Sequence, residues 1–302
     1  MPTIQNHSAR RDVHGEVIDC HDGCLRFFGG SYFLYGTAYG DSDGFTPANR
    51  YVVYASPNLK DWIPRGDLLA APLPGVSYRP YVVRRPCDGR YVLWFNWYPE
   101  LWEGRFGVAV SDTPEGPFEV VDEAVEVSQP EPGDHNVAVG ADGTGWLIYT
   151  SIPDRGQGDH GMSVERLSGD LCSSTGENSG FLDFQVEAPS LFEHAGSWWA
   201  LFGNTCCFCP EGAGARLYRA QHPLGPWAFV RDINRDDDGG VIVAGQQTDV
   251  APLPGGVLLF MADRWGSRGD GVKGHDLQHW EPLALDDRGV PRRLQNLPEA
   301  SW

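Results

Sequence analysis

Carboxylate side chains stand at the start of several apolar segments of this sequence, and their positions are its first indication of chemistry. Glu187 opens the apolar run "VEAPSLF", Asp134 lies just ahead of "VAVGADGTGWLIYTS", and Asp22 lies in "DCHDGCL". Any one of these acids alone would be interpreted as a solvated side chain at the end of a strand. Three acids at equivalent positions of a repeat would face one space, where like charge and partial desolvation separate their pKa values.

Two carboxyl groups with different pKa values are what the hydrolysis of a glycosidic bond requires. One group stays protonated and gives its proton to the leaving oxygen, while the other takes a proton from water. The three acids therefore predict acid–base chemistry on a glycoside, on the condition that the fold brings them together.

A repeating unit of roughly fifty residues predicts the elements that would do so, because this period is in the range of propeller blades. Each unit contains a pair of strands: an apolar strand, a turn containing glycine, and a second strand. The five pairs are "CLRFFGGSYFLYG", "YVVRRPCDGRYVLWFNW", "VAVGADGTGWLIYTS", "PSLFEHAGSWWALFG" and "VAPLPGGVLLFMADRW". We expect an all-β, five-bladed β-propeller that forms a single domain over residues 1–302. Residues at the start of each innermost strand would then converge on one pocket.

The composition limits the partners and the setting of the chain. A formal net charge of −18 over 302 residues argues against nucleic acid and anionic membrane surfaces as partners. No apolar run is long enough to span a bilayer, and the polar start "MPTIQNHSARRD" has no secretory h-region. Seven cysteines do not indicate a disulfide framework, and they favour a reducing, cytoplasmic location.

Five of the cysteines lie in two groups, which are Cys206, Cys207 and Cys209 in "NTCCFCP" and Cys20 and Cys24 near the start of the chain. Their spacing does not match the paired knuckles of a zinc site. We therefore expect small buried side chains here and no metal site.

The chain resembles glycoside hydrolase family 43, a family of five-bladed propeller enzymes that cleave glycosidic bonds with inversion. The resemblance lies in "RPYVVRRPCDGRYVLWFNW", "FGVAVSDTPEGPF", "VEAPSLFEHAGSWWALFG", "GQQTDVAPLPG" and "FMADRW", taken in this order and spacing. These segments look most like the exo-β-1,3-galactanase branch of the family. The resemblance implies that Glu187 is the general acid, that Asp134 tunes and orients it, and that Asp22 is the general base.

Two positions depart from the galactanase pattern. That branch has glycine where this chain has Asp22 and is thought to use a glutamine as base, which Gln246 matches here. We favour Asp22, because a carboxylate is a far better proton acceptor than an amide, and we assign Gln246 to a sugar hydroxyl or the attacking water. The branch also has a glutamate just ahead of Arg-Pro, where this chain has Tyr78 before Arg79.

Further substrate contacts are expected from both charged and aromatic residues. The expected set is His21, Tyr78, Arg79, Trp97, His135, Gln246, Arg264 and Trp265. Trp97 is included because it lies in the loop-like stretch "NWYPELWEG", although most tryptophans of a propeller pack between blades. Asp263 is expected to pair with Arg264. No cofactor is expected to be required, and a structural calcium ion in the central channel stays open.

The favoured function is an inverting, exo-acting glycoside hydrolase that releases terminal arabinofuranose, galactofuranose, xylose or galactose. A non-catalytic propeller that binds glycans or proteins is the alternative. A phosphorolytic enzyme would need a basic phosphate site, and the sequence offers Arg79 and Arg264 without a cluster. The oligomeric state stays open.

Overall fold

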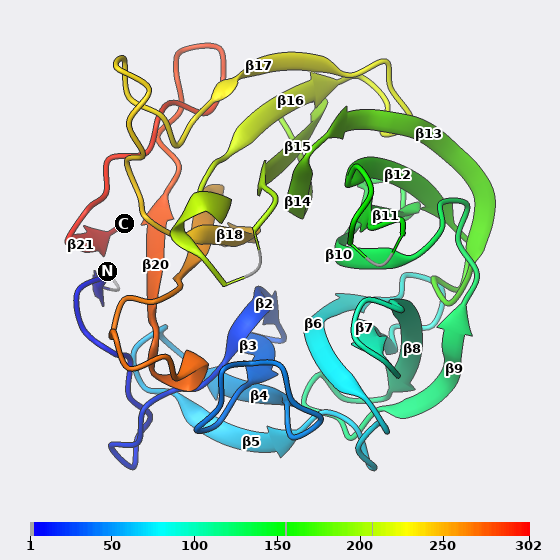
Figure 1. Cartoon of the computed structure of the whole chain (residues 1–302), viewed down its shortest axis with the longest axis horizontal. Coiled ribbons are helices and arrows are strands. Elements are labelled where there is room, and N and C mark those ends of the chain that lie inside the picture. The colour runs from blue at the N-terminus through cyan, green and yellow to red at the C-terminus, as the bar shows by residue number, and fades with distance from the viewer. Residues whose placement is uncertain (1–2, 155, 207) are drawn as a thin grey trace.

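The computed structural model describes residues 3–154, 156–206 and 208–302, and most of its regular structure is β-sheet. Five antiparallel sheets surround a central axis like the blades of a propeller (Figure 1). This arrangement confirms the predicted all-β, five-bladed β-propeller. The helical elements of these residues are the short 3-10 turns η1 (Pro210–Gly212) and η2 (Lys273–His275). None of the described helices is long and apolar enough to cross a membrane.

The strands run through the blades in chain order, from the innermost strand outward. Blade 1 contains β2 (His21–Phe28), β3 (Ser31–Ala38), β4 (Arg50–Ser56) and β5 (Ile63–Asp67). Blade 2 contains β6 (Val76–Arg84), β7 (Tyr91–Tyr98), β8 (Arg105–Ser111) and β9 (Glu119–Val125). Blade 3 contains β10 (Pro132–Val139), β11 (Gly145–Ser151), β12 (Gly161–Leu167) and β13 (Ser174–Phe184). Blade 4 contains β14 (Val186–His194), β15 (Ser197–Asn204), β16 (Arg216–Ala220) and β17 (Ala228–Asp232). Blade 5 contains β18 (Gln246–Leu253), β19 (Val257–Arg264) and β20 (Leu277–Pro282).

The two ends of the chain meet beside blade 5 and close the ring (Figure 1). There β1 (Thr3–Gln5) pairs antiparallel with β21 (Glu299–Ser301). The side-chain amide of Asn6 donates hydrogen bonds to the carbonyl oxygens of Trp280 and Leu297, each at 2.9 Å. The N-terminal segment is thereby fixed to the last blade before it enters the first.

Large aromatic side chains fill the space between neighbouring blades. Trp62 of blade 1 and Trp280 of blade 5 are fully buried, and their rings meet edge to face with centroids 6.1 Å apart. This contact packs blade 1 against blade 5, where the ring closes.

Every innermost strand has a register shift near its start, where it pairs with the second strand of its blade. The shifts lie between His21 and Cys24, Tyr78 and Tyr81, Pro132 and His135, Glu187 and Ser190, and Gln247 and Asp249. Asp22 (φ 53°), Arg79 (φ 51°) and Ala188 (φ 56°) have left-handed backbone at these points. Irregular backbone of this kind costs of order 1–3 kcal/mol per residue and is typical of functional sites, because it re-aims side chains.

A polar network links the innermost strands of three blades at the hub. Asp249 accepts hydrogen bonds from Asn136 Nδ2 at 3.0 Å and from the backbone N–H of Leu25 at 3.3 Å, and it pairs with Arg26 Nη1 at 2.5 Å. These groups come from β2, β10 and β18, so they tie the blades together at the hub.

Candidate active site

A cavity of about 440 Å³ lies at the starts of the innermost strands. Each blade contributes polar residues to its lining, which are Asp22 from β2, Tyr78 and Arg79 from β6, Asp134 from β10, Glu187 from β14 and Gln246 from β18. The structure thus brings the three predicted acids together around one space, although each comes from a different blade.

Arg79 joins two of the acids. Its Nη2 lies 3.1 Å from Asp22 Oδ1, and its Nε lies 2.8 Å from Asp134 Oδ1. The Arg79 side chain is 2% exposed and the Asp22 side chain 6%, so the pair with Asp22 is shielded from solvent, whereas Asp134 is partly exposed. The third nitrogen, Nη1, is buried and has no hydrogen-bond partner among the described residues. Arg79 therefore holds Asp22 and Asp134 in a fixed relation and has one donor left for water or a ligand.

Asp22 is buried, and both of its carboxylate oxygens are engaged. Oδ1 faces Arg79, and Oδ2 accepts a hydrogen bond from the Tyr39 hydroxyl. Burial raises the pKa of Asp22 to about 6, and the Asp263 and Asp134 carboxylates add to the rise while Arg79 opposes it. Asp22 is therefore ionised above about pH 6, in the range where a general base works well.

Behind Asp22 lies a second layer formed by His21 and Asp263. Asp263 Oδ2 accepts the backbone N–H of Asp22 at 2.7 Å, and its Oδ1 lies 2.9 Å from His21 Nδ1. Burial alone would lower the pKa of His21, but Asp263 outweighs it and raises that pKa to about 9. His21 does not line the cavity; it holds Asp263, which in turn fixes the backbone of Asp22.

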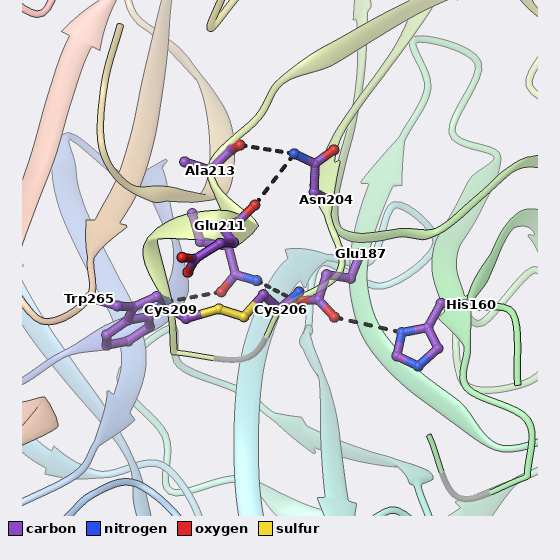
Figure 2. Close-up of a disulfide and its surroundings, with 9 residues drawn as sticks. His160, Glu187, Asn204, Cys206, Cys209, Glu211, Ala213 and Trp265 are labelled. Carbon is purple, nitrogen blue, oxygen red and sulfur yellow. Dashed lines mark hydrogen bonds and ion pairs between the residues drawn. A yellow bond between two sulfur atoms is a disulfide. The ribbon is translucent and has the colours of Figure 1, made fainter. Parts of the chain in front are cut away.

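Glu187 has a different set of partners (Figure 2). Its Oε1 accepts hydrogen bonds from Gln246 Nε2 at 2.7 Å and from the backbone N–H of Cys206 at 2.9 Å. Its Oε2 lies 3.8 Å from His160 Nδ1. Burial raises the pKa of Glu187, His160 opposes the rise, and the Asp134 carboxylate adds to it. The environment therefore favours the protonated form of Glu187.

Asp134 connects the base side of the cavity to the acid side. Its Oδ1 contacts Arg79, and its Oδ2 accepts a hydrogen bond from the backbone N–H of Ala188 at 3.0 Å. Ala188 directly follows Glu187, so this bond sets the local backbone that presents the acid. The orienting role that the resemblance implies for Asp134 stays a prediction.

Gln246 has both ends of its amide occupied. Nε2 donates to Glu187, and Oε1 accepts a hydrogen bond from Trp265 Nε1 at 3.0 Å. The structure thus places the amide against the acid, where the sequence suggested contact with a sugar hydroxyl or a water. Trp265 is itself buried behind Gln246 and orients it.

Five of the expected substrate contacts do not line the cavity. His21 and Trp265 lie behind Asp22 and Gln246, as described above, and the other three are buried elsewhere or lie near the chain ends. Trp97 is buried because β7 continues to Tyr98, and its indole N–H donates to the Glu123 carbonyl oxygen at 2.7 Å within the core of blade 2. His135 is enclosed by Tyr81 and Phe106, and burial lowers its pKa to about 3.

Arg264 is the third of these residues. Its Nη1 donates to the carbonyl oxygen of Asn6 at 3.4 Å, beside the chain ends. Asp263 does not pair with it as expected, because its carboxylate is directed to His21 and to the backbone of Asp22. The side chains of neighbouring residues in a strand point to opposite faces, which explains why the two separate.

Aromatic residues form a further part of the cavity wall. Tyr78 lines it with its hydroxyl bonded to the Gly44 carbonyl oxygen at 2.9 Å, and Tyr98, Trp102 and Phe208 lie nearby. The Tyr78 ring lies 5.6 Å from Tyr98 and 6.1 Å from Phe208, measured between centroids. Flat apolar faces of this kind suit contact with the apolar face of a ring ligand.

The cysteines differ from the expectation. Cys20 and Cys24 are buried thiols, as predicted. Cys206 and Cys209, however, form a disulfide beside Glu187 (Figure 2), and Cys207 lies outside the described residues. The prediction of small buried side chains is therefore wrong for this pair. A disulfide is uncommon in a reducing cytoplasm, so the bond removes the argument for that location that came from the cysteine count.

Sequence reasoning missed Tyr39, His160 and Phe208, which contact the acids or line the cavity. Tyr39 directly follows β3, and its position at the rim of blade 1 is a signal that a search limited to innermost strands overlooks. His160 lies in the segment between β11 and β12, outside the five strand pairs of the repeat.

The structural calcium ion in the central channel stays an open expectation. Within the described residues, the only trio of His, Cys, Asp or Glu ligand atoms close enough to hold a metal is Cys206, Cys209 and Glu211. Its two sulfurs are bonded to each other. In the channel itself, Asp249 is already paired with Arg26.

Comparisons with known proteins agree with this architecture. The family model of glycosyl hydrolases family 43 matches residues 29–248, which is more than two thirds of the chain. The search of curated proteins found no match to this chain. A solved family 43 β-1,3-galactosidase with galactodeoxynojirimycin has a TM-score of 0.84 and 24% identity, over 96% of this chain and 97% of that one.

Two exo-β-1,3-galactanases have the same fold. The enzyme from Phanerochaete chrysosporium, solved with β-1,3-galactotriose, has a TM-score of 0.80 and 22% identity over 97% of this chain and 67% of that one. The enzyme from Clostridium thermocellum has a TM-score of 0.80 and 23% identity over 96% of this chain and 64% of that one. This chain therefore spans about two thirds of the length of these two proteins.

Proposed function

Because the chain belongs to glycosyl hydrolases family 43, it is a glycosidase that acts on a carbohydrate, and we propose that it releases one terminal sugar at a time with inversion. The observation that carries this proposal is the difference between two buried carboxyl groups at one cavity. Asp22 contacts a buried arginine, whereas Glu187 accepts hydrogen bonds from uncharged donors.

The proposed reaction is a single displacement. Glu187 donates its proton to the leaving oxygen while Asp22 takes a proton from a water that attacks the other face of the sugar. We expect the two carboxyl groups to stand about 6.5–9.5 Å apart with substrate bound, which leaves room for that water. Arg79 Nη1, which has no hydrogen-bond partner among the described residues, is our candidate donor to that water or to a sugar hydroxyl.

The size of the cavity supports exo action. Its volume of about 440 Å³ is toward the small end of the usual range for small-molecule sites, roughly 300–1,000 Å³. A cavity of this size suits a chain end that inserts one sugar.

Terminal galactose in a β-1,3 linkage is our first candidate for the sugar. Its support is that the solved structures named above are a β-1,3-galactosidase and exo-β-1,3-galactanases. The position of Tyr78, where the galactanase branch has glutamate, argues for testing other sugars as well. Arabinofuranose, galactofuranose and xylose are therefore separate arms of the experiment.

The test combines a substrate panel with NMR. Purified protein is incubated with β-1,3-galactobiose and with nitrophenyl β-galactopyranoside, β-galactofuranoside, α-arabinofuranoside and β-xylopyranoside, and the first anomer released is identified. We expect a monosaccharide of inverted configuration. Retained configuration, or release of internal fragments from a longer galactan, would contradict the proposal.

Two glutamates of β14 provide a matched pair of variants. Glu187→Gln should lower kcat/KM by roughly 10²–10⁴-fold, because general acid catalysis contributes about that much. Glu193→Gln, at the exposed far end of the same strand, should leave kcat/KM unchanged. Normal turnover by Glu187→Gln would exclude Glu187 as the acid.

A further inference from the structure

The two oxygens of Glu187 have unequal surroundings. Oε1 accepts two N–H groups, from Gln246 at 2.7 Å and from the Cys206 backbone at 2.9 Å. An oxygen whose acceptor sites are filled by donors is a poor place for a proton. In the acid form of Glu187 the proton therefore resides on Oε2, and the leaving oxygen must approach from the side of Oε2.

His160 occupies that side of the cavity (Figure 2). Its Nδ1 lies 3.8 Å from Glu187 Oε2, and its side chain is 16% exposed, so the imidazole reaches both the acid and the solvent. Its carbonyl oxygen accepts the backbone N–H of Gln185 at 2.7 Å, just ahead of β14. This bond ties the segment that carries His160 to the strand that carries Glu187.

We propose that His160 is a positioning residue on the leaving-group side, which orients Oε2 of Glu187 and, as a cation, makes Glu187 a stronger acid. This inference rests on the proposed function, in which Glu187 donates the proton. It adds a residue to the machinery that neither the repeat pattern nor the comparisons identify.

The charges around Glu187 fix the sign of the effect. Among the described residues His160 faces it from the segment before β12 and Asp134 from β10, with Arg79 and Asp22 beyond Asp134. Burial and Asp134 raise the pKa of Glu187, and His160 lowers it. Glu187 in turn raises the pKa of His160. Without His160, Glu187 keeps its proton to a higher pH and donates it less readily.

The experiment uses the full chain and the substrate identified by the panel above. His160→Gln is compared with the parent over a pH range and over aryl glycosides whose leaving groups differ in acidity. His222→Gln, an exposed histidine outside the cavity, is the matched control. We expect the alkaline limb of kcat/KM to move up by about one pH unit. We also expect kcat to fall about tenfold more for poor leaving groups than for good ones.

A uniform loss of rate for all leaving groups, with the alkaline limb unmoved, would mean that His160 only supports the loop, and the inference would fail. Should His160→Gln not fold, His160→Ala assayed with and without added imidazole gives the second measurement, and absence of rescue on poor leaving groups counts against the inference. The proposed function fails by other results, namely retained activity in Glu187→Gln or retained configuration of the product.

Discussion

Removal of the Tyr39 hydroxyl tests the assignment of the general base. Tyr39 donates a hydrogen bond to Asp22 Oδ2, and its backbone N–H is held independently by Asp19 Oδ1 at 3.0 Å. Its ring packs against Trp265 and Phe208, with centroids 5.9 and 5.4 Å away. Tyr39→Phe therefore deletes one donor to the carboxylate while the backbone anchor and the ring contacts remain.

The size of the effect follows from the lost bond. A hydrogen bond to a charged group contributes roughly 1.5–3 kcal/mol, and one pKa unit corresponds to about 1.4 kcal/mol. The pKa of Asp22, about 6 in the parent, should therefore rise by about 1–2 units. Asp22 acts as a base only when ionised, so activity is lost as the pH falls through this pKa. The acid limb of kcat/KM should move upward, and the rate at pH 6 should fall roughly 5- to 50-fold.

The assay is kcat/KM from pH 4.5 to 9 for the parent, Tyr39→Phe and a control, Tyr51→Phe. Tyr51 is also buried, but its hydroxyl donates to the carbonyl oxygen of Asn96 at 2.6 Å and not to an acid. The control should keep the parental acid limb. If the acid limb of Tyr39→Phe overlays that of the parent, Asp22 is not the base, and Gln246 becomes the remaining candidate.

Two further outcomes follow from the site and its surroundings. Reduction of the Cys206–Cys209 disulfide with dithiothreitol should lower kcat/KM about tenfold, because the bond fixes the loop whose Cys206 N–H donates to Glu187. The double variant Cys206→Ser, Cys209→Ser should not respond to dithiothreitol. Equal kcat/KM values of the parent with and without dithiothreitol would refute this role of the disulfide. Trp97→Ala should lower the free energy of unfolding by about 3–5 kcal/mol in urea titrations, because Trp97 is a core residue. The KM of the folded fraction should stay unchanged, because Trp97 lies outside the cavity. A raised KM without loss of stability would show that Trp97 contacts the substrate.

The number of blades could be predicted because its signals are local. Each blade begins with an apolar strand, a turn containing glycine and a second strand, and these features recur at a fixed spacing along the chain. The place of the acids followed from the same repeat, since the start of every innermost strand lies at one end of the channel. The position along the repeat was enough to group Asp22, Asp134 and Glu187, and the direction of their side chains was not needed.

Side-chain direction is what the sequence could not provide. A shift of one residue in a strand moves a side chain from one face of the sheet to the other, and every innermost strand has such a shift near its start. Asp134 therefore faces the cavity while His135, the next residue, is enclosed by Tyr81 and Phe106. The contacts of Tyr39 and His160 with the acids arise where separate segments meet, so no short motif predicts them.

The electrostatic asymmetry of the site explains how two buried carboxyl groups are given opposite roles. Burial raises the pKa of both Asp22 and Glu187. The shielded guanidinium of Arg79, 3.1 Å from Asp22, opposes that rise and favours the ionised base. In the described part of the chain, the one ion pair of Glu187 is with His160 at 3.8 Å, a longer contact with a group that can itself lose its charge. The ionised form of Asp22 is thus stabilised by a permanent cation, whereas the ionised form of Glu187 is stabilised only while His160 is protonated. Reversed roles would require Asp22 to hold a proton against Arg79, and the geometry therefore favours Asp22 as base and Glu187 as acid.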